Sequence, residues 1–224
     1  MGIDELPFEE QIDHIRTRRD FISSSGLEAL RKRLRDFESP ETLEHCSAVA
    51  EMVIRLARIM GETDERTLEG YRIGAELHDI GKTDPDLKPL LHKSDSLGSE
   101  EKTTLSAHSL SGRKLLSDYA VSRIDTVVIV IYHHERFDGK GYPEGLKGEN
   151  IPLPARLFSV IDALDAMLGD RSYHRGGKPR SYVESELRAN AGSQFDPKIV
   201  DIVLQNFDSI TDGINFHNRI EPAK

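Results

Sequence analysis

The chain has 224 residues, 37% of them hydrophobic and 31% charged, which is typical of a globular protein with one main domain. The formal net charge of −9 argues against binding to a DNA or RNA polymer, because surfaces that bind nucleic acid are usually basic. No apolar run approaches the roughly 18 residues that span a bilayer, and the acidic N-terminus does not resemble a secretory leader. With a single cysteine and hence no intrachain disulfide, we expect a cytoplasmic protein that is not bound to a membrane.

Residues 1–38 are predicted to form a short N-terminal helical extension. They are rich in charge, and apolar residues recur at helical spacing at Leu27, Leu30 and Leu34. The pattern leaves open whether this extension packs onto the core, forms a homodimer or binds a signalling partner. It ends at Ser39-Pro40, where a serine cap and a proline in the first turn predict the start of the next helix.

Helices are predicted through the rest of the chain, because apolar residues recur three and four apart in the segments 41–60, 65–77, 99–118, 154–168, 181–191 and 197–207. The helix at 99–118 carries His108 and would bury Leu110 and Leu116. Residues 127–131 are β-branched, and their intrinsic propensity favours a strand. We predict helix there as well, because a lone strand would leave backbone groups unpaired in the core. The predicted fold class is therefore all-α.

Glu41 and His45 form the first candidate pair for chemistry. They are four residues apart, so on a helix they share a face with Val49 and Val53, which is the face that the pattern buries. A carboxylate and an imidazole that face a core must be paired, hydrogen-bonded or bound to metal, because an isolated buried charge costs several kcal/mol. Taken alone, the pair is explained more simply as a core histidine capped by a neighbouring glutamate.

The pair His78-Asp79 follows the helix at 65–77, and Gly81 behind it frees the backbone to turn. A histidine supplies nitrogen to a divalent ion, and an adjacent carboxylate can bridge two ions through its two oxygens. Lys82 can meet a phosphate as a point charge. The dipeptide arises often by chance, so its simpler explanation is an exposed helix end.

His133 and His134 follow the long apolar run, so at least one imidazole must emerge beside the core. Successive helical residues diverge by about a hundred degrees, which suits neighbouring positions of a metal cluster as well as one buried and one solvated histidine. Asp162 and Asp165 share a face of an apolar helix and would repel each other, unless that face is wet or a metal ion lies beneath Asp162.

These signals gain weight together, because the apolar faces of the helices that carry them must converge on one core. Imidazoles and carboxylates without a thiolate would suit iron or manganese, with zinc, nickel or cobalt as alternatives. The sequence therefore predicts a site for more than one metal ion in the core of a helical domain.

The order of these residues resembles the HD-GYP subgroup of the HD phosphohydrolase superfamily. The resemblance covers about residues 40 to 207 and leaves 208–224 as a polar tail, so we predict a domain at 39–207. It is carried by the spacing of Glu41 and His45, by His78-Asp79-Ile80-Gly81-Lys82, by His108, and by the stretch from His133-His134-Glu135 to Gly141-Tyr142-Pro143. Downstream it continues in Asp162-Ala163-Leu164-Asp165, Arg171-Ser172-Tyr173 and Gly192-Ser193-Gln194-Phe195-Asp196-Pro197.

The resemblance implies an HD-type helical bundle with a centre of two or three divalent ions that hydrolyses cyclic di-GMP to pGpG and in some members on to GMP. The implied metal ligands are Glu41, His45, His78, Asp79, His108, His133, His134 and Asp162, with Asp79 as the bridge. Glu41 implies a third ion. Lys82 and Arg171 would hold phosphate, Asp165 the guanine or a water, and Tyr142 would border the pocket.

A hydroxide held between two ions would attack phosphorus in line, with Asp79 and Lys82 as the residues nearest to the reaction. One alternative is an HD phosphohydrolase that acts on another nucleotide, such as cyclic GMP-AMP. Another is a non-catalytic sensor that binds a cyclic dinucleotide or a partner protein through the Gly-Tyr-Pro loop. The complete ligand set disfavours the sensor.

Overall fold

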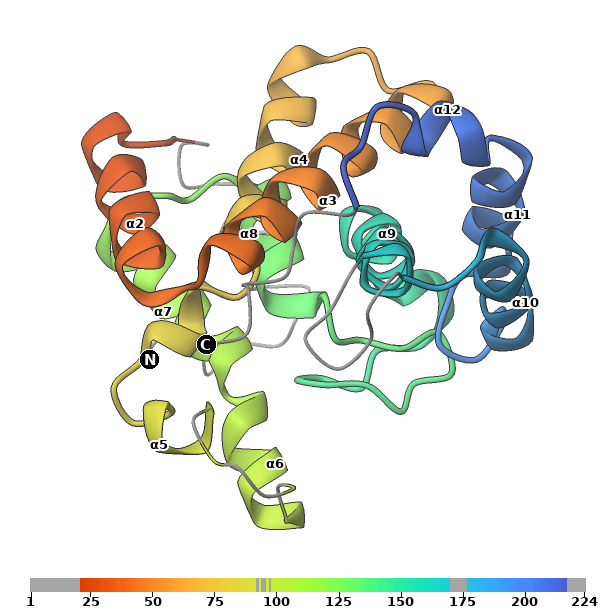
Figure 1. Ribbon diagram of the computed structural model, residues 1–224. Coiled ribbons are helices and arrows are strands. Elements are labelled where there is room, and N and C mark those ends of the chain that lie inside the picture. Colours follow the sequence, from red (N-terminus) through yellow and green to blue (C-terminus); the bar gives the residue numbers. More distant parts are fainter. Residues whose placement is uncertain (1–20, 92, 94–95, 97, 170–176, 217–224) are drawn as a thin grey trace.

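The computed structural model describes residues 21–91, 93, 96, 98–169 and 177–216, and in this part of the chain every element longer than an isolated bridge is a helix (Figure 1). The predicted all-α fold is therefore confirmed. In chain order the helices are α2 (Ser24–Phe37), α3 (Pro40–Ile59), α4 (Glu65–Leu77), η2 (Ile80–Thr83), α5 (Lys88–Leu91), α6 (Ser99–Ser106), α7 (His108–Asp118), α8 (Ile124–Tyr132), η3 (Gly148–Asn150), α9 (Leu153–Leu168), α10 (Arg180–Asn190), α11 (Pro197–Gln205) and α12 (Phe207–Thr211).

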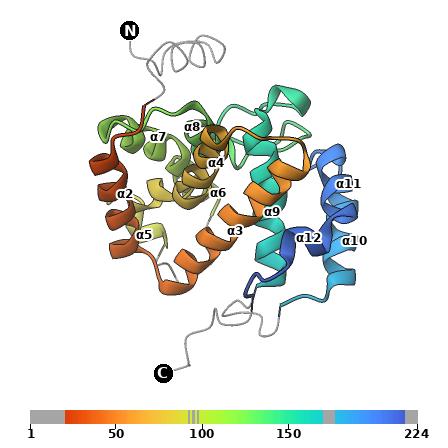
Figure 2. The same cartoon turned by 90° about the horizontal axis from the view of Figure 1, so that it is seen from above.

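Four helices form the centre of the bundle. Helix α3 packs on α4 and α9, and α8 packs on the same two helices. Seen from above, α2 and α10 to α12 lie at opposite ends of this group (Figure 2). One apolar cluster joins α3 and α9 to α10, α11 and α12, and a second joins α2 and α7 to the centre, while α4 and α8 contribute to both.

Helix α8 is the segment whose β-branched residues favour a strand by propensity. Every residue from Thr126 to Tyr132 is buried, with Ile129 in one apolar cluster and Val130 in the other. The Thr126 hydroxyl donates to the Gly70 carbonyl at 2.9 Å. Burial on all sides outweighs a propensity that spans about 1 kcal/mol, so the prediction of a helix is confirmed.

The single helix predicted at 99–118 is wrong, because the chain breaks into α6 and α7 at Ala107. The Ala107 N–H donates to the Thr104 carbonyl at 3.1 Å, and the next turn starts at His108. None of the residues of α6 is buried, whereas α7 buries His108 and Leu116. Leu110 is 46% exposed, contrary to the prediction that the helix would bury it. The break lets His108 enter the core while α6 stays outside.

Helix α2, the described part of the extension, packs onto the core, while a homodimer or a signalling partner through the extension stays a prediction. Its residues Leu27, Leu30 and Leu34 are buried in a cluster with Leu77 and Ile80, next to the His78-Asp79 pair. Residues 1–20 lie outside the described part of the chain. The division at residue 38 stays a prediction.

At the other end of the chain, α12 continues into the segment assigned to the polar tail. Ile210 is fully buried there, while residues 217–224 are not described. The division at residue 207 stays a prediction. Among the described helices, none has the length and apolar character that crossing a bilayer requires.

The packing of α2 predicts a large loss of stability for Leu30→Ala. Leu30 is fully buried, so the cavity should lower the free energy of unfolding by about 2 to 5 kcal/mol. Leu110→Ala is the control, because that exposed helical leucine should change the same quantity by less than about 0.5 kcal/mol. Urea denaturation followed by circular dichroism measures both. Equal losses in the two variants would contradict the packing of α2.

Candidate metal centre

The pair His78-Asp79 lies where α4 ends and the tighter helix η2 begins. The Asp64 side chain caps the N-terminus of α4, and the helix delivers His78 into the core, where it is 4% exposed. The His78 Nδ1–H donates to the Ala75 carbonyl at 2.9 Å, because a carbonyl can only accept. Its Nε2 then faces Asp79 Oδ2 at 3.2 Å.

Two further histidines are oriented in the same way by the backbone at helix ends. Their Nδ1–H groups donate to carbonyls of the preceding turn, His108 to Leu105 at 2.8 Å and His133 to Ile129 and Val130, both at 3.1 Å. Their Nε2 atoms lie 3.2 Å apart and face Asp79 Oδ1 at 3.4 and 3.7 Å. An outer partner that fixes the ring and its tautomer is the usual companion of a metal-binding histidine.

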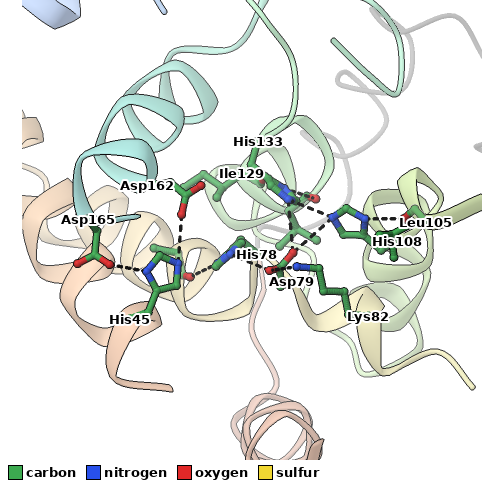
Figure 3. Close-up of polar contacts among 12 residues, drawn as sticks. His45, His78, Asp79, Lys82, Leu105, His108, Ile129, His133, Asp162 and Asp165 are labelled. Carbon is green, nitrogen blue, oxygen red and sulfur yellow. Dashed lines mark hydrogen bonds and ion pairs between the residues drawn. The ribbon is translucent and has the colours of Figure 1, made fainter. Parts of the chain in front are cut away.

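His45 is held between two carboxylates of α9. Its Nδ1 contacts Asp165 Oδ2 at 2.5 Å, and its Nε2 lies 3.1 Å from Asp162 Oδ1 (Figure 3). Asp165 has no exposed surface, whereas the Asp162 side chain is 34% exposed. Asp165 therefore lies behind the ring and Asp162 in front of it.

The Asp79 carboxylate connects two groups of side chains. Within each group, the possible ligand atoms all lie within 4.8 Å of one another. The first group is Asp79, His108, His133 and His134, and the second is His45, His78 and Asp162. Asp79 Oδ2 contacts Lys82 Nζ at 2.5 Å and faces His78 of the second group. Oδ1 is buried and has no hydrogen-bond partner within the described part of the chain. An unpaired buried carboxylate oxygen that faces two imidazole nitrogens fits a bound cation, which would satisfy all three atoms.

Burial also prepares two imidazoles of the first group, His108 and His134, for metal binding. It lowers the pKa of His108 to about 4, and with the repulsion of His133 it lowers the pKa of His134 to about 2. Both rings are therefore neutral at pH 7, which is the form that donates a lone pair to a metal ion.

The second group is rich in negative charge. Burial disfavours the charged form of His45 and His78, but hydrogen bonds and charge from Asp162 and Asp165, and from Asp79, outweigh it and raise both pKa values. The carboxylates thus favour positive charge at this place, as a divalent cation would supply.

The structure brings together most of the predicted ligands, from α3, the end of α4, the start of α7, the end of α8, and α9. They are His45, His78, Asp79, His108, His133, His134 and Asp162. Glu41 lies in the first turn of α3, but its side chain is outside the described part of the structure, as is all of Arg171. Their predicted roles stay predictions.

The position of Asp165 does not suit the contact with a guanine or a water that the resemblance implied. Its carboxylate is fully buried and bonded to the back of His45. Helical spacing correctly placed it near Asp162, but spacing does not show that the ring of His45 lies between the two carboxylates. Asp165 is placed to orient His45.

Glu135 is the residue whose part in the site the sequence reasoning missed. It is 3% exposed and accepts from the Glu144 N–H at 2.8 Å, so it fixes the loop that returns over the two histidines. A side-chain carbon on Gly141 would lie 2.5 Å from the His134 carbonyl oxygen, so only glycine allows this close return. The loop places the Tyr142 ring 4.7 Å from the ring of His134. The signal available in the sequence was an acidic residue directly after two candidate ligands.

The chain matches the HD domain family model over residues 26–199. The chain belongs to the HD domain family. It is 36% identical over 194 residues to a probable cyclic di-GMP phosphodiesterase of Vibrio cholerae, which covers 78% of this chain and 43% of that protein. It is 33% identical to the 3'3'-cGAMP-specific phosphodiesterase 2 of the same organism, over 76% of this chain and 32% of that protein.

Family membership confirms the resemblance that the motifs suggested. The chain spans less than half the length of these two curated relatives. The fold is also that of a solved cyclic GMP-AMP-specific phosphodiesterase of Vibrio cholerae, with a TM-score of 0.62 at 18% identity over 88% of this chain and 55% of that one.

Divalent metal should stabilise the protein. After treatment with a chelator, added Mn²⁺ at a hundred times its Kd should raise the free energy of unfolding by about 2.7 kcal/mol, because the folded state alone offers the assembled groups. Thermal unfolding with and without Mn²⁺ measures the gain. The isosteric variant Asp79→Asn should lose most of it, and an unchanged gain in that variant would contradict the central place of Asp79.

Proposed function

We propose that the chain is a metal-dependent phosphodiesterase that hydrolyses a cyclic dinucleotide, cyclic di-GMP, to pGpG. The observation that carries the proposal is the Asp79 carboxylate, which lies between two groups of candidate ligands. The Nε2 atom of His78 faces one of its oxygens, and those of His108 and His133 face the other. Two relatives of the chain at above 30% identity carry names of cyclic dinucleotide phosphodiesterases, which supports the same chemistry here.

Two groups of residues would hold the ions. His45, His78 and Asp162 would bind one, His108, His133 and His134 a second, and Asp79 both, with Glu41 available to a third. Iron or manganese suits these ligands best. Divalent ions bound there would neutralise phosphate charge and make water acidic enough to attack phosphorus at neutral pH.

Lys82 supplies the fixed positive charge that the chain itself brings to the phosphate. Burial opposes its charge, but Asp79 outweighs burial and raises the pKa of Lys82, so the ammonium persists at neutral pH. Its side chain is 27% exposed and can reach a phosphate oxygen without leaving Asp79. Arg171 is proposed as the second phosphate contact from the sequence motif alone.

Tyr142 is proposed to contact the substrate at the edge of the centre. Its ring lies beside His134 and 6.3 Å from His108, on the loop that Glu135 holds. A planar ring in that position offers a surface for a base while the phosphodiester approaches Asp79 and Lys82. Asp165 acts behind His45 and is not proposed to contact substrate.

The direct test is turnover by the metal-loaded protein. We expect it to convert cyclic di-GMP into pGpG, and Asp79→Ala to lower kcat by about a thousandfold or more, as the loss of metal-assisted catalysis would. Asp86→Ala is the control, because that exposed carboxylate on the loop after η2 should leave kcat unchanged. Chromatography of the products also shows whether cyclic GMP-AMP is the preferred substrate. Near-normal hydrolysis by Asp79→Ala with full metal content would refute the assignment.

The loop predicts a separate effect on substrate binding. Gly141→Ala places a carbon against the backbone of His134 and must displace Tyr142, so KM should rise by about tenfold with a smaller change in kcat. Lys140→Ala, at an exposed position of the same loop, is the matched control. Steady-state kinetics would reject the role of Tyr142 if KM stayed the same in both variants.

A further inference from the structure

The short helix η2 links the candidate metal centre to α2. It follows Asp79 directly and carries Lys82, whose Nζ contacts Asp79 Oδ2. Its backbone bonds are those of a tight turn, such as the bond from the Lys82 N–H to the Asp79 carbonyl at 2.9 Å and the bond from the Asp84 N–H to the Gly81 carbonyl at 3.0 Å. Such short helices hold their shape poorly alone, so external contacts must fix where Lys82 points.

Arg33 of α2 supplies a contact of this kind. Its Nε–H donates to the Thr83 hydroxyl at 2.6 Å, and a terminal N–H donates to the Thr83 carbonyl at 2.9 Å. The Thr83 hydroxyl in turn donates to the Ile80 carbonyl at 2.7 Å, and Thr83 is only 7% exposed. The Arg33 guanidinium therefore holds Thr83, the last residue of η2, directly. Through the Thr83 hydroxyl it also holds Ile80, the first residue of η2.

Packing on both sides of η2 adds to the contacts that Arg33 makes. Leu34 of α2 and Ile80 of η2 share a buried apolar cluster, so the two helices cannot slide apart without exposing it. On its other side η2 meets α7, where a side-chain carbon on Gly81 would lie 1.8 Å from the His108 carbonyl oxygen. The segment is thus held between α2 and the start of α7, and Arg33 makes the polar contacts on the α2 side.

We propose that Arg33 is a positioning residue of the phosphodiesterase centre: through Thr83 and η2 it holds Lys82 in place against Asp79. Its guanidinium makes its recorded contacts with Thr83, and none of these is with a candidate ligand among the described side chains. A displacement of α2 would reach Lys82 through this contact, so α2 belongs to the working site. The activity readout below rests on the proposed function.

Hydrogen exchange tests the mechanical part without substrate. In Arg33→Ala, the amides of Lys82 and Asp84 should exchange about tenfold faster than in the unmodified protein, because the charge-assisted bonds that hold η2 are lost. Arg33→Lys keeps the positive charge but lacks the forked guanidinium, so its exchange rates should lie between those of the unmodified protein and those of Arg33→Ala. Arg35→Ala is the matched control, because Arg35 pairs with Glu28 on the exposed face of the same helix. Unchanged exchange in Arg33→Ala would overturn the proposal.

Kinetics of a double-mutant cycle test the link to Lys82. When Arg33→Ala is the only change, kcat/KM should fall by about tenfold. When Lys82→Ala is already present, the same substitution should lower kcat/KM by less than about twofold. Metal content, measured in the same samples, should stay the same in Arg33→Ala. Equal losses in both backgrounds, or loss of metal, would overturn the assignment to Lys82. If the unmodified protein hydrolyses no cyclic dinucleotide, the proposed function fails, and the exchange comparison still decides whether Arg33 fixes η2.

Discussion

The rest of the site depends on one carboxylate, that of Asp79, whose side chain is only 13% exposed. A carboxylate in a protein interior must be paired, because its desolvation costs several kcal/mol. Asp79 has Lys82 and His78 at one oxygen and two imidazole nitrogens at the other, so the helices that deliver these groups converge on it. The pKa of Asp79 is held well below its usual range, since His78 and Lys82 outweigh the effect of burial. A permanent anion in the core is what gives the surrounding histidines a common point to face.

The histidines are oriented before any ligand arrives, because the fold places them at helix ends. At the end of α4 and α8 and at the start of α7, carbonyls of the preceding turn accept from Nδ1 and turn Nε2 inward. His45 lies inside α3, and there the Asp165 carboxylate of α9, rather than a carbonyl, contacts Nδ1. The bundle thus supplies outer partners for four rings from backbone and from Asp165, which accounts for a fully buried acid outside the ligand groups.

Much of this could be predicted from the sequence, and the failures have physical reasons. Periodicity predicted three of the four central helices, the unpaired backbone of a lone strand argued for the fourth, α8, and motif order predicted which residues converge. Periodicity could not predict the break before His108, because the sequences of α6 and α7 together keep a helical pattern, although only α7 has buried residues. The position of Asp165 behind His45, and the clamp of Arg33 on Thr83, depend on how distant segments pack. Local spacing carries no information about such contacts.

The central claim is that Asp79 lies between two bound ions. Anomalous diffraction from crystals grown with manganese or iron, recorded at the absorption edge of that metal, tests it most directly. The account predicts one peak beside His108 and His133, a second beside His45 and His78, and Asp79 in contact with both. A single peak that Asp79 does not touch, or peaks away from these histidines, would contradict it.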